Sequence, residues 1–326
     1  MRDHPRLLGT LAVVVAASGF GFLGILSRFS YDAGLAPLPF IAWRGVFGFV
    51  VVLIVIAARA RSGVRIVDPR SLSRADQVSL AVVGLSAIGL NLGMFLGFGV
   101  ASIAIVLLAF YTYPALVALV AVGLGHERLD TMGWTALALA VGGMVLVVAG
   151  GPAAGDASAL QPIGLLLGLA AAGCQVVFVT ASRGRYRSVP SEQVMGWQLI
   201  LVAVACAGAS VAVGSDLAVP LANPRVLGLV VVTGLIAAGI PSILFLVGIR
   251  AIGGTRAGVL MLIEPLVGVT LAALVLGEAL HPIQLAGGLA ILGAALLLQR
   301  TRPGAPAGES PLEALEPAAV PAREGA

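Results

Sequence analysis

Residues 113–129 read YPALVALVAVGLGHERL, and residues 264–280 read EPLVGVTLAALVLGEAL. The two stretches are 151 residues apart, and the same offset brings three prolines of the first half onto prolines of the second: Pro39 onto Pro190, Pro69 onto Pro220 and Pro114 onto Pro265. With five prolines in residues 1–150 and eight in residues 152–301, chance would align fewer than one pair. The chain is therefore interpreted as an internal duplication.

The composition indicates a membrane protein. Apolar residues make up 59 % of the 326 residues, charged residues only 10 %, and the mean hydropathy is +1.07. A soluble domain carries about 25 % charged residues. The net charge of +4 does not indicate nucleic-acid binding, because the arginines are spread over loops between apolar stretches. Cys174 and Cys206 lie inside apolar stretches without metal-ligand spacing, so we expect no metal and no cofactor.

Ten stretches are long enough to cross the bilayer, since a helix needs about 20 apolar residues to span the hydrocarbon core. They lie near residues 7–27, 39–58, 77–97, 102–122, 131–150, 161–180, 192–213, 226–247, 255–276 and 282–299. We predict an all-α integral membrane protein with ten transmembrane helices in two inverted five-helix repeats, residues 7–150 and 161–299. Residues 301–326, rich in Pro, Ala, Glu and Gly, are expected to form a disordered cytoplasmic tail.

The distribution of arginine predicts the orientation. Sixteen of the 19 arginines fall in the termini and loops of one side, whereas Arg28 and Arg225 lie on the other side and Arg44 lies within a span. The positive-inside rule then places both termini in the cytoplasm of a multi-pass protein of the cell membrane. Five spans per copy is an odd number, so the copies insert upside down relative to each other. Inverted copies of this kind can exchange inward-facing and outward-facing states around one central site.

Glu264 is the most informative single residue, because it stands near the middle of the predicted ninth span and is followed by Pro265. A charge at the bilayer centre costs about 2.5–3.5 kcal/mol on insertion scales and usually faces a cavity or relays protons. Proline lacks an N–H, so the carbonyl of Met261, four residues earlier, loses its usual partner. Glu264 either lines a substrate cavity or stays protonated and bonds a neighbouring helix.

The corresponding place in the first copy is Tyr113-Pro114, with Tyr111 two residues earlier. Pro114 frees the carbonyl of Phe110 in the same way. Tyrosine can line a polar pocket or fill a core. The symmetry of the two copies brings both broken helices toward one central region, as expected for a substrate site made by discontinuous helices.

Other polar residues within spans are candidates for substrate contacts. Arg44 follows Trp43 and lies about one turn inside the second span. It either snorkels to the interface, with Trp43 as a belt residue, or provides the counter-charge to a substrate carboxylate or to Glu264. The remaining candidates, each of which could instead bond another helix, are Asn91, Gln175 and Gln198.

Two groups of residues have structural interpretations. Glu127 and Glu278 lie just past the ends of their spans, where carboxylates favour the N-terminus of the next helix. Gly89, Gly93 and Gly97 are spaced four apart on one predicted helix, which indicates close packing against another helix.

The two stretches quoted first resemble the pattern E/Y-P-x-x-x-x-L-x-x-x-x-L-G-E-x-L of EamA domains in the drug/metabolite transporter superfamily, and the resemblance covers about residues 7–299. It implies ten helices in two inverted repeats, cytoplasmic termini, a central cavity lined by helices including spans four and nine, and secondary transport, commonly export, of metabolites, amino acids or drugs. The second copy keeps the Gly277-Glu278 pair. The first copy departs from the pattern, because Gly125 is displaced and His126 precedes Glu127.

We interpret the chain as a secondary transporter that exports a small metabolite, amino-acid-like or amphipathic, by alternating access around a central cavity. A flippase of lipid-linked sugars is the alternative within transport. An intramembrane enzyme is disfavoured, because the sequence has no GxSG with a partnering histidine, no HExxH and no paired DxxD carboxylates. The expected partners are a small-molecule substrate and membrane lipid. A proton as the coupling ion and a homodimer are left open.

Overall fold

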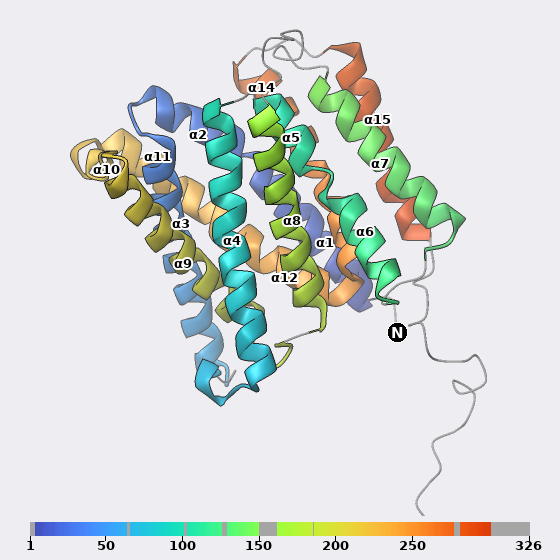
Figure 1. The fold of residues 1–326 in the computed structure, drawn as a ribbon, viewed down its shortest axis with the longest axis horizontal. Coiled ribbons are helices and arrows are strands. Elements are labelled where there is room, and N and C mark those ends of the chain that lie inside the picture. Colours follow the sequence, from blue (N-terminus) through green and yellow to red (C-terminus); the bar gives the residue numbers. More distant parts are fainter. Residues whose placement is uncertain are drawn as a thin grey trace, which may run out of the picture.

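The structure is a computed structural model, and it describes residues 4–63, 66–100, 103–125, 129–149, 162–184, 186–276 and 281–300 (Figure 1). All regular elements in these residues are helical. The first half contains α1 His4–Gly21, α2 Leu23–Asp32, α3 Pro37–Arg61, the short turn η1 Pro69–Ser71, α4 Arg74–Val100, α5 Ile103–Phe110, α6 Tyr113–Gly123 and α7 Thr131–Ala149. The second half contains α8 Pro162–Gly184, α9 Ser191–Ala212, α10 Val219–Ala222, α11 Pro224–Gly234, the π-helical turn η3 Leu235–Gly239, α12 Ile240–Ile252, α13 Gly254–Met261, α14 Ile263–Leu276 and α15 Pro282–Arg300. The predicted tail lies outside the described residues.

The helices have the length and composition of membrane spans. Within the described residues, eight helical segments are long and apolar enough to cross a bilayer, and Tyr113–Gly123 and Pro282–Leu297 are shorter apolar helices. The chain is therefore an all-helical, multi-pass membrane protein. The predicted span at 102–122 is divided in the structure between α5 and α6.

The helix boundaries repeat at the offset that aligns the sequence with itself. Helix α5 and helix α13 begin and end at residues 151 apart, and so do α7 and α15. Helix α3 ends 151 residues before α9 ends. The duplication in the sequence is thus also a duplication of structure.

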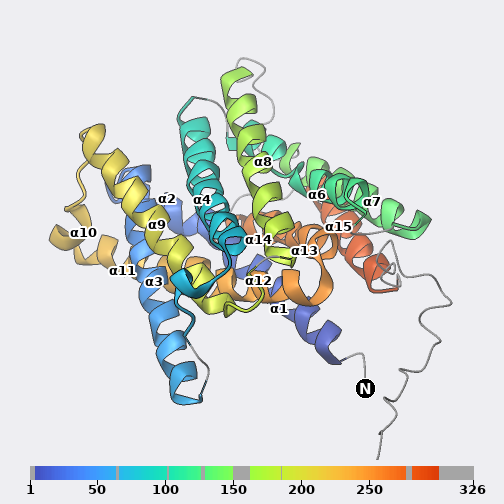
Figure 2. The same ribbon diagram turned by 60° about the horizontal axis from the view of Figure 1, so that its bottom comes forward.

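The packing of the helices has the same symmetry. The long pairs are α7 with α15, α3 with α9, α4 with α8, and α1 with α12. Exchange of the two copies converts the pair α1–α12 into the pair α8–α4 and leaves the other two pairs unchanged. Helix α1 starts near the bottom of Figure 1 and α8 starts near the top, and Figure 2 agrees. Corresponding helices therefore run in opposite directions, as inverted repeats require.

Glycines allow these pairs to approach closely. A Cβ atom built on Gly143 of α7 would lie 2.6 Å from the carbonyl oxygen of Gly287 on α15, and one on Gly45 of α3 would lie 2.9 Å from Cβ of Ala203 on α9. The predicted glycine stripe on α4 has the same role. A Cβ atom built on Gly93 would lie 3.0 Å from the carbonyl oxygen of Leu167 on α8. Small residues let helix backbones meet in a bilayer, where burial of apolar surface provides no driving force between helices.

The close packing of α7 on α15 can be tested with two glycine variants. Gly143→Leu should destabilise the α7–α15 pair by about 1–3 kcal/mol, because the new side chain must displace the facing backbone. Gly142→Leu should have little effect, since a Cβ on Gly142 meets nothing within 4 Å. Thermal unfolding in detergent, followed by size-exclusion fluorescence, measures both. Equal melting temperatures for the two variants would contradict this packing.

Candidate functional site

Two helix breaks lie where the prolines predict them. Helix α5 ends at Phe110 and α6 begins at Tyr113, while α13 ends at Met261 and α14 begins at Ile263. Phe110 and Met261 are the residues whose carbonyls lose a partner to Pro114 and Pro265. Both spans are therefore discontinuous at corresponding residues of the two copies.

Two further breaks were not predicted from the sequence. The first span has a turn at Phe22, between α1 and α2, where the backbone keeps helical dihedral angles (φ −70°, ψ −17°), and the eighth is interrupted at η3, where Ala237 has φ −123° and ψ 15°. The corresponding helices of the other copy, α8 and α4, are continuous. A proline signal existed for η3, because Pro241 stands four residues after Ala237. The turn at Phe22 has no proline signal, but Gly19, Gly21 and Gly24 flank it and weaken the helix there.

The broken spans meet in one region. A Cβ added to Gly21, at the end of α1, would lie 3.0 Å from the carbonyl oxygen of Glu264, and one added to Gly19 would lie 2.6 Å from the carbonyl oxygen of Ile236 in η3. The backbone of α1 therefore passes directly beside the acid of the ninth span and the irregular turn of the eighth. Irregular backbone at membrane depth is typical of substrate sites.

Arg44 on α3 is held by one hydrogen bond. Its Nη2 donates to Oδ1 of Asn91 on α4 over 3.1 Å, and Nδ2 of Asn91 donates to the carbonyl of Ala87 over 2.8 Å, which turns the amide oxygen toward Arg44. The Nε of Arg44 is buried and has no hydrogen-bond partner in the part of the chain that the structure describes. The buried hydroxyl of Tyr31, on α2, lies within electrostatic range of the same guanidinium. Arg44 thus retains unused donor capacity inside the protein.

Glu264 lies on the other side of this region. Its carboxyl group interacts electrostatically with the hydroxyl groups of Tyr111 and Tyr113. Both tyrosines are buried, and the ring of Phe110 lies 5.3 Å from that of Tyr111. Arg44 and Glu264 also interact electrostatically across the region.

Five helices and the turn between α5 and α6 therefore supply six residues to one polar region. We call them the polar cluster: Tyr31, Arg44, Asn91, Tyr111, Tyr113 and Glu264. The cluster combines a guanidinium, a carboxyl group, an amide and three phenols, so it can bind a carboxylate and an ammonium group at the same time. Tyr31 was missed in the sequence, since its proximity to Arg44 arises only from the packing of α2 on α3.

Three other candidate residues lie elsewhere. The Nε1 of Trp43 donates to the carbonyl of Leu217 over 2.9 Å, and its ring stacks on Phe47 at 5.8 Å. Gln198 on α9 donates to the carbonyl of Val83 over 3.3 Å. Gln175 is a half-buried residue of α8. Glu127 and Glu278, proposed for helix N-termini, lie outside the described residues.

A second polar network links the copies at the end of the bundle that carries most of the arginines, which we call the arginine-rich end. Arg59 at the end of α3 pairs with Glu192 at the start of α9, with 3.0 Å to each carboxylate oxygen. The side chain of Gln193 bonds both the N–H and the carbonyl of Val67. The end of α3 and the loop after it are thereby joined to the start of α9.

The same end holds the loop between α8 and α9. The N–H of Tyr186 donates to Oδ1 of Asp76 over 2.9 Å. Arg250 of α12 donates to the carbonyl of Val189 over 2.8 Å and to Oγ of Ser191 over 3.0 Å, and its guanidinium lies 5.9 Å from the ring centre of Tyr186. These bonds close the arginine-rich end in this conformation.

The ion pair of this end can be tested by its stability. Arg59→Ala should destabilise the protein by about 1 kcal/mol, because it leaves a buried carboxylate without its partner. Solvent weakens the attraction within this ion pair, since the Arg59 side chain is 53 % exposed whereas that of Glu192 is 2 % exposed. Arg61→Ala, an exposed arginine one half-turn later on α3, is the control and should leave the melting temperature unchanged. If the two variants melt together, the ion pair contributes nothing.

Comparison with known proteins agrees with this architecture. A crystal structure of a protein 20 % identical in sequence superposes with a TM-score of 0.74, covering 91 % of this chain and 97 % of that chain, and 28 chains of solved structures match in all. No curated protein sequence matches. The model of the EamA-like transporter family matches twice, at residues 7–149 and 162–300, which together cover most of the chain. The chain therefore belongs to the EamA-like transporter family.

Proposed function

We propose that the chain is a secondary transporter that exports a small metabolite, amino-acid-like or amphipathic, with the polar cluster as its substrate site. The observation that carries this proposal is that Arg44, bonded to Asn91, and Glu264, beside Tyr111, interact electrostatically at the level where the helices are broken. Discontinuous helices around a midplane site are typical of secondary transporters with inverted repeats.

The chemistry of the cluster supports a substrate with two polar ends. Arg44 can receive a carboxylate through its unpartnered Nε and a second guanidinium nitrogen, in the bidentate geometry that arginine favours. Glu264 can receive an ammonium group or exchange a proton, and Tyr113 and Phe110 supply aromatic surface for an apolar side chain. In this proposal the substrate separates Arg44 from Glu264 and satisfies both.

Alternating access then follows from the inverted copies. We propose that the arginine-rich end faces the cytoplasm of the cell membrane, as the positive-inside rule predicts, with both termini on that side. The network around Arg59, Glu192 and Gln193 would break when the substrate enters from the cytoplasm and would form again when the site opens outward. A homodimer is not required by this mechanism.

The function is tested in two steps. Metabolites in the medium and in cells are compared between cells that produce the wild-type protein, cells that produce Glu264→Gln and cells without the protein. A compound whose export requires the wild-type protein is then followed in proteoliposomes, with and without a pH gradient. Transport that proceeds without a pH gradient, and is unaltered by one, would remove the proton from the proposal. If purified protein moves no compound that the cells export, secondary transport is the wrong assignment.

A further inference from the structure

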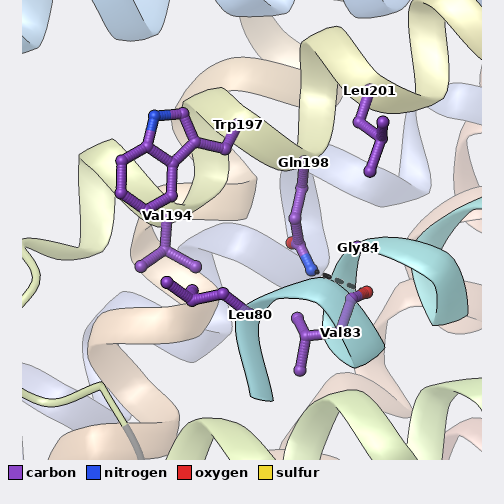
Figure 3. Close-up of a pocket in the computed structure, with 7 residues that line it drawn as sticks. All are labelled: Leu80, Val83, Gly84, Val194, Trp197, Gln198 and Leu201. Atoms are coloured by element: carbon purple, nitrogen blue, oxygen red, sulfur yellow. Dashed lines mark hydrogen bonds between the residues drawn. The ribbon is translucent and has the colours of Figure 1, made fainter. Parts of the chain in front are cut away.

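An apolar groove lies between α4 of the first copy and α9 of the second. It is a shallow hollow of about 50 Å³, and Figure 3 shows its lining. Leu80, Val83 and Gly84 come from α4, and Val194, Trp197, Gln198 and Leu201 come from α9. The bond from Gln198 to the carbonyl of Val83 crosses it. The groove is separate from the polar cluster.

The groove opens sideways, toward the surface that lipid covers. Its floor is formed by Val83 and Val194, which are 0 % and 1 % exposed, while Leu201 at its rim is 41 % exposed. Leu201 stands in the same row of α9 as Val204 and Val211, which are 63 % and 70 % exposed. A groove with a buried floor and a rim on the apolar outer surface can receive an acyl chain.

The groove is a difference between the two copies. In the corresponding seam, between α3 and α11, positions 43 and 47 hold Trp43 and Phe47, whose rings stack at 5.8 Å. In the second copy these positions are Val194 and Gln198. In the first copy Phe47 packs closely on Gly234, the counterpart of Val83, whereas in the second copy Gln198 and Trp197 line a groove beside Val83.

Arginines surround the near end of the groove. Leu80 is six residues after Arg74, the first residue of α4, and Trp197 is six residues after Ser191, the first residue of α9. Six residues of α-helix rise about 9 Å, which places the loops before both helices at headgroup level when the groove lies in the hydrocarbon. Arg70, Arg74 and Arg187 in these loops are all exposed. The bond between Tyr186 and Asp76 holds Arg187 beside the start of α4.

We propose that this groove is a binding site for an anionic phospholipid of the leaflet at the arginine-rich end, with an acyl chain between α4 and α9 and the phosphate on Arg70, Arg74 and Arg187. Juxtamembrane arginines attract anionic headgroups by about 1 kcal/mol each. Because the groove lies on a seam between the two copies, the bound lipid contacts both of them, whatever the protein transports.

The test uses the fluorescence of Trp197. The chain has three tryptophans, so Trp43→Phe and Trp134→Phe leave Trp197 alone. This variant is reconstituted into phosphatidylcholine vesicles in which acyl-dibrominated phosphatidylglycerol or acyl-dibrominated phosphatidylcholine replaces a rising fraction of the lipid. Half-maximal quenching should need at least about threefold less of the anionic lipid, given the attraction of several arginines.

Three variants distinguish a site from simple exposure to lipid. Arg70→Gln, Arg74→Gln and Arg187→Gln together should abolish the preference, whereas Arg225→Gln at the opposite end should keep it. Gln198→Phe, which copies the first repeat, should fill the groove and reduce quenching by both lipids. Equal quenching by the two lipids in the parent protein, or a preference that survives the triple change, overturns the proposal. Native mass spectrometry of the wild type, with phosphatidylglycerol retained over phosphatidylcholine, gives an independent reading if a variant folds poorly.

Discussion

Glu264→Gln is expected to reduce the rate of transport at least about tenfold, because a hydrogen bond to a charged group contributes about 1.5–3 kcal/mol. Glutamine keeps the size of the side chain and can still accept from Tyr111, so the fold should be preserved. It can neither carry a negative charge for an ammonium group nor exchange a proton. The measurement is uptake of the identified substrate into proteoliposomes at several pH values, and the variant should also lose the pH dependence of the wild type.

Two controls separate this role from a structural one. Tyr111→Phe removes a hydroxyl that interacts with Glu264 but leaves the carboxyl group, so transport should fall less, by about threefold to tenfold. Thr270→Ala, further along α14, removes a hydroxyl that bonds only the carbonyl of Leu266 within its own helix, and it should have no effect. Unchanged transport and unchanged pH dependence in Glu264→Gln would remove both roles from this residue.

The sequence predicts the duplicated, all-helical membrane architecture because the signals are local. Apolar length, the 151-residue offset and the positions of Pro114 and Pro265 are all properties of the chain itself, and the breaks at Phe110 and Met261 follow from a missing N–H. The break at Ala237 obeys the same rule through Pro241, so it was predictable and was overlooked.

The rest of the site depends on which helices pack against one another. The hydrophobic pattern of the sequence does not specify these helix pairs. Gly19, Gly21 and Gly24 weaken the helix around Phe22 without fixing where it turns, and Gly19 and Gly21 pack closely against η3 and Glu264. Trp43 and Arg44 are neighbours in sequence, yet Trp43 bonds the loop carbonyl of Leu217 while Arg44 turns toward Asn91. Only the placement of α4, α10 and α11 around α3 separates these two roles.

Arg44→Ala should raise the apparent KM for a carboxylate-bearing substrate about tenfold to a hundredfold, because a charge-assisted contact to a guanidinium is lost. The maximal rate should change less, since Glu264 and the broken helices remain. Arg44→Lys keeps the positive charge, but a lysine cannot bind a carboxylate in bidentate geometry and bond Asn91 at the same time. Its KM should therefore lie between those of the wild type and Arg44→Ala. Arg225→Ala, an exposed residue in the first turn of α11 in the other copy, is the control for a general loss of positive charge.

The substrate supplies the decisive comparison. An amide analogue, which lacks the carboxylate charge, should bind the wild type more weakly than the parent compound and should bind Arg44→Ala about as well as it binds the wild type. That pattern assigns the lost affinity to one pair of charges, because removing either partner then makes removal of the other nearly without effect. If the amide loses affinity equally in the wild type and the variant, the carboxylate contacts another group. Arg44 then acts only through its charge on Glu264, and the polar cluster has to recognise its substrate through the acid and the tyrosines.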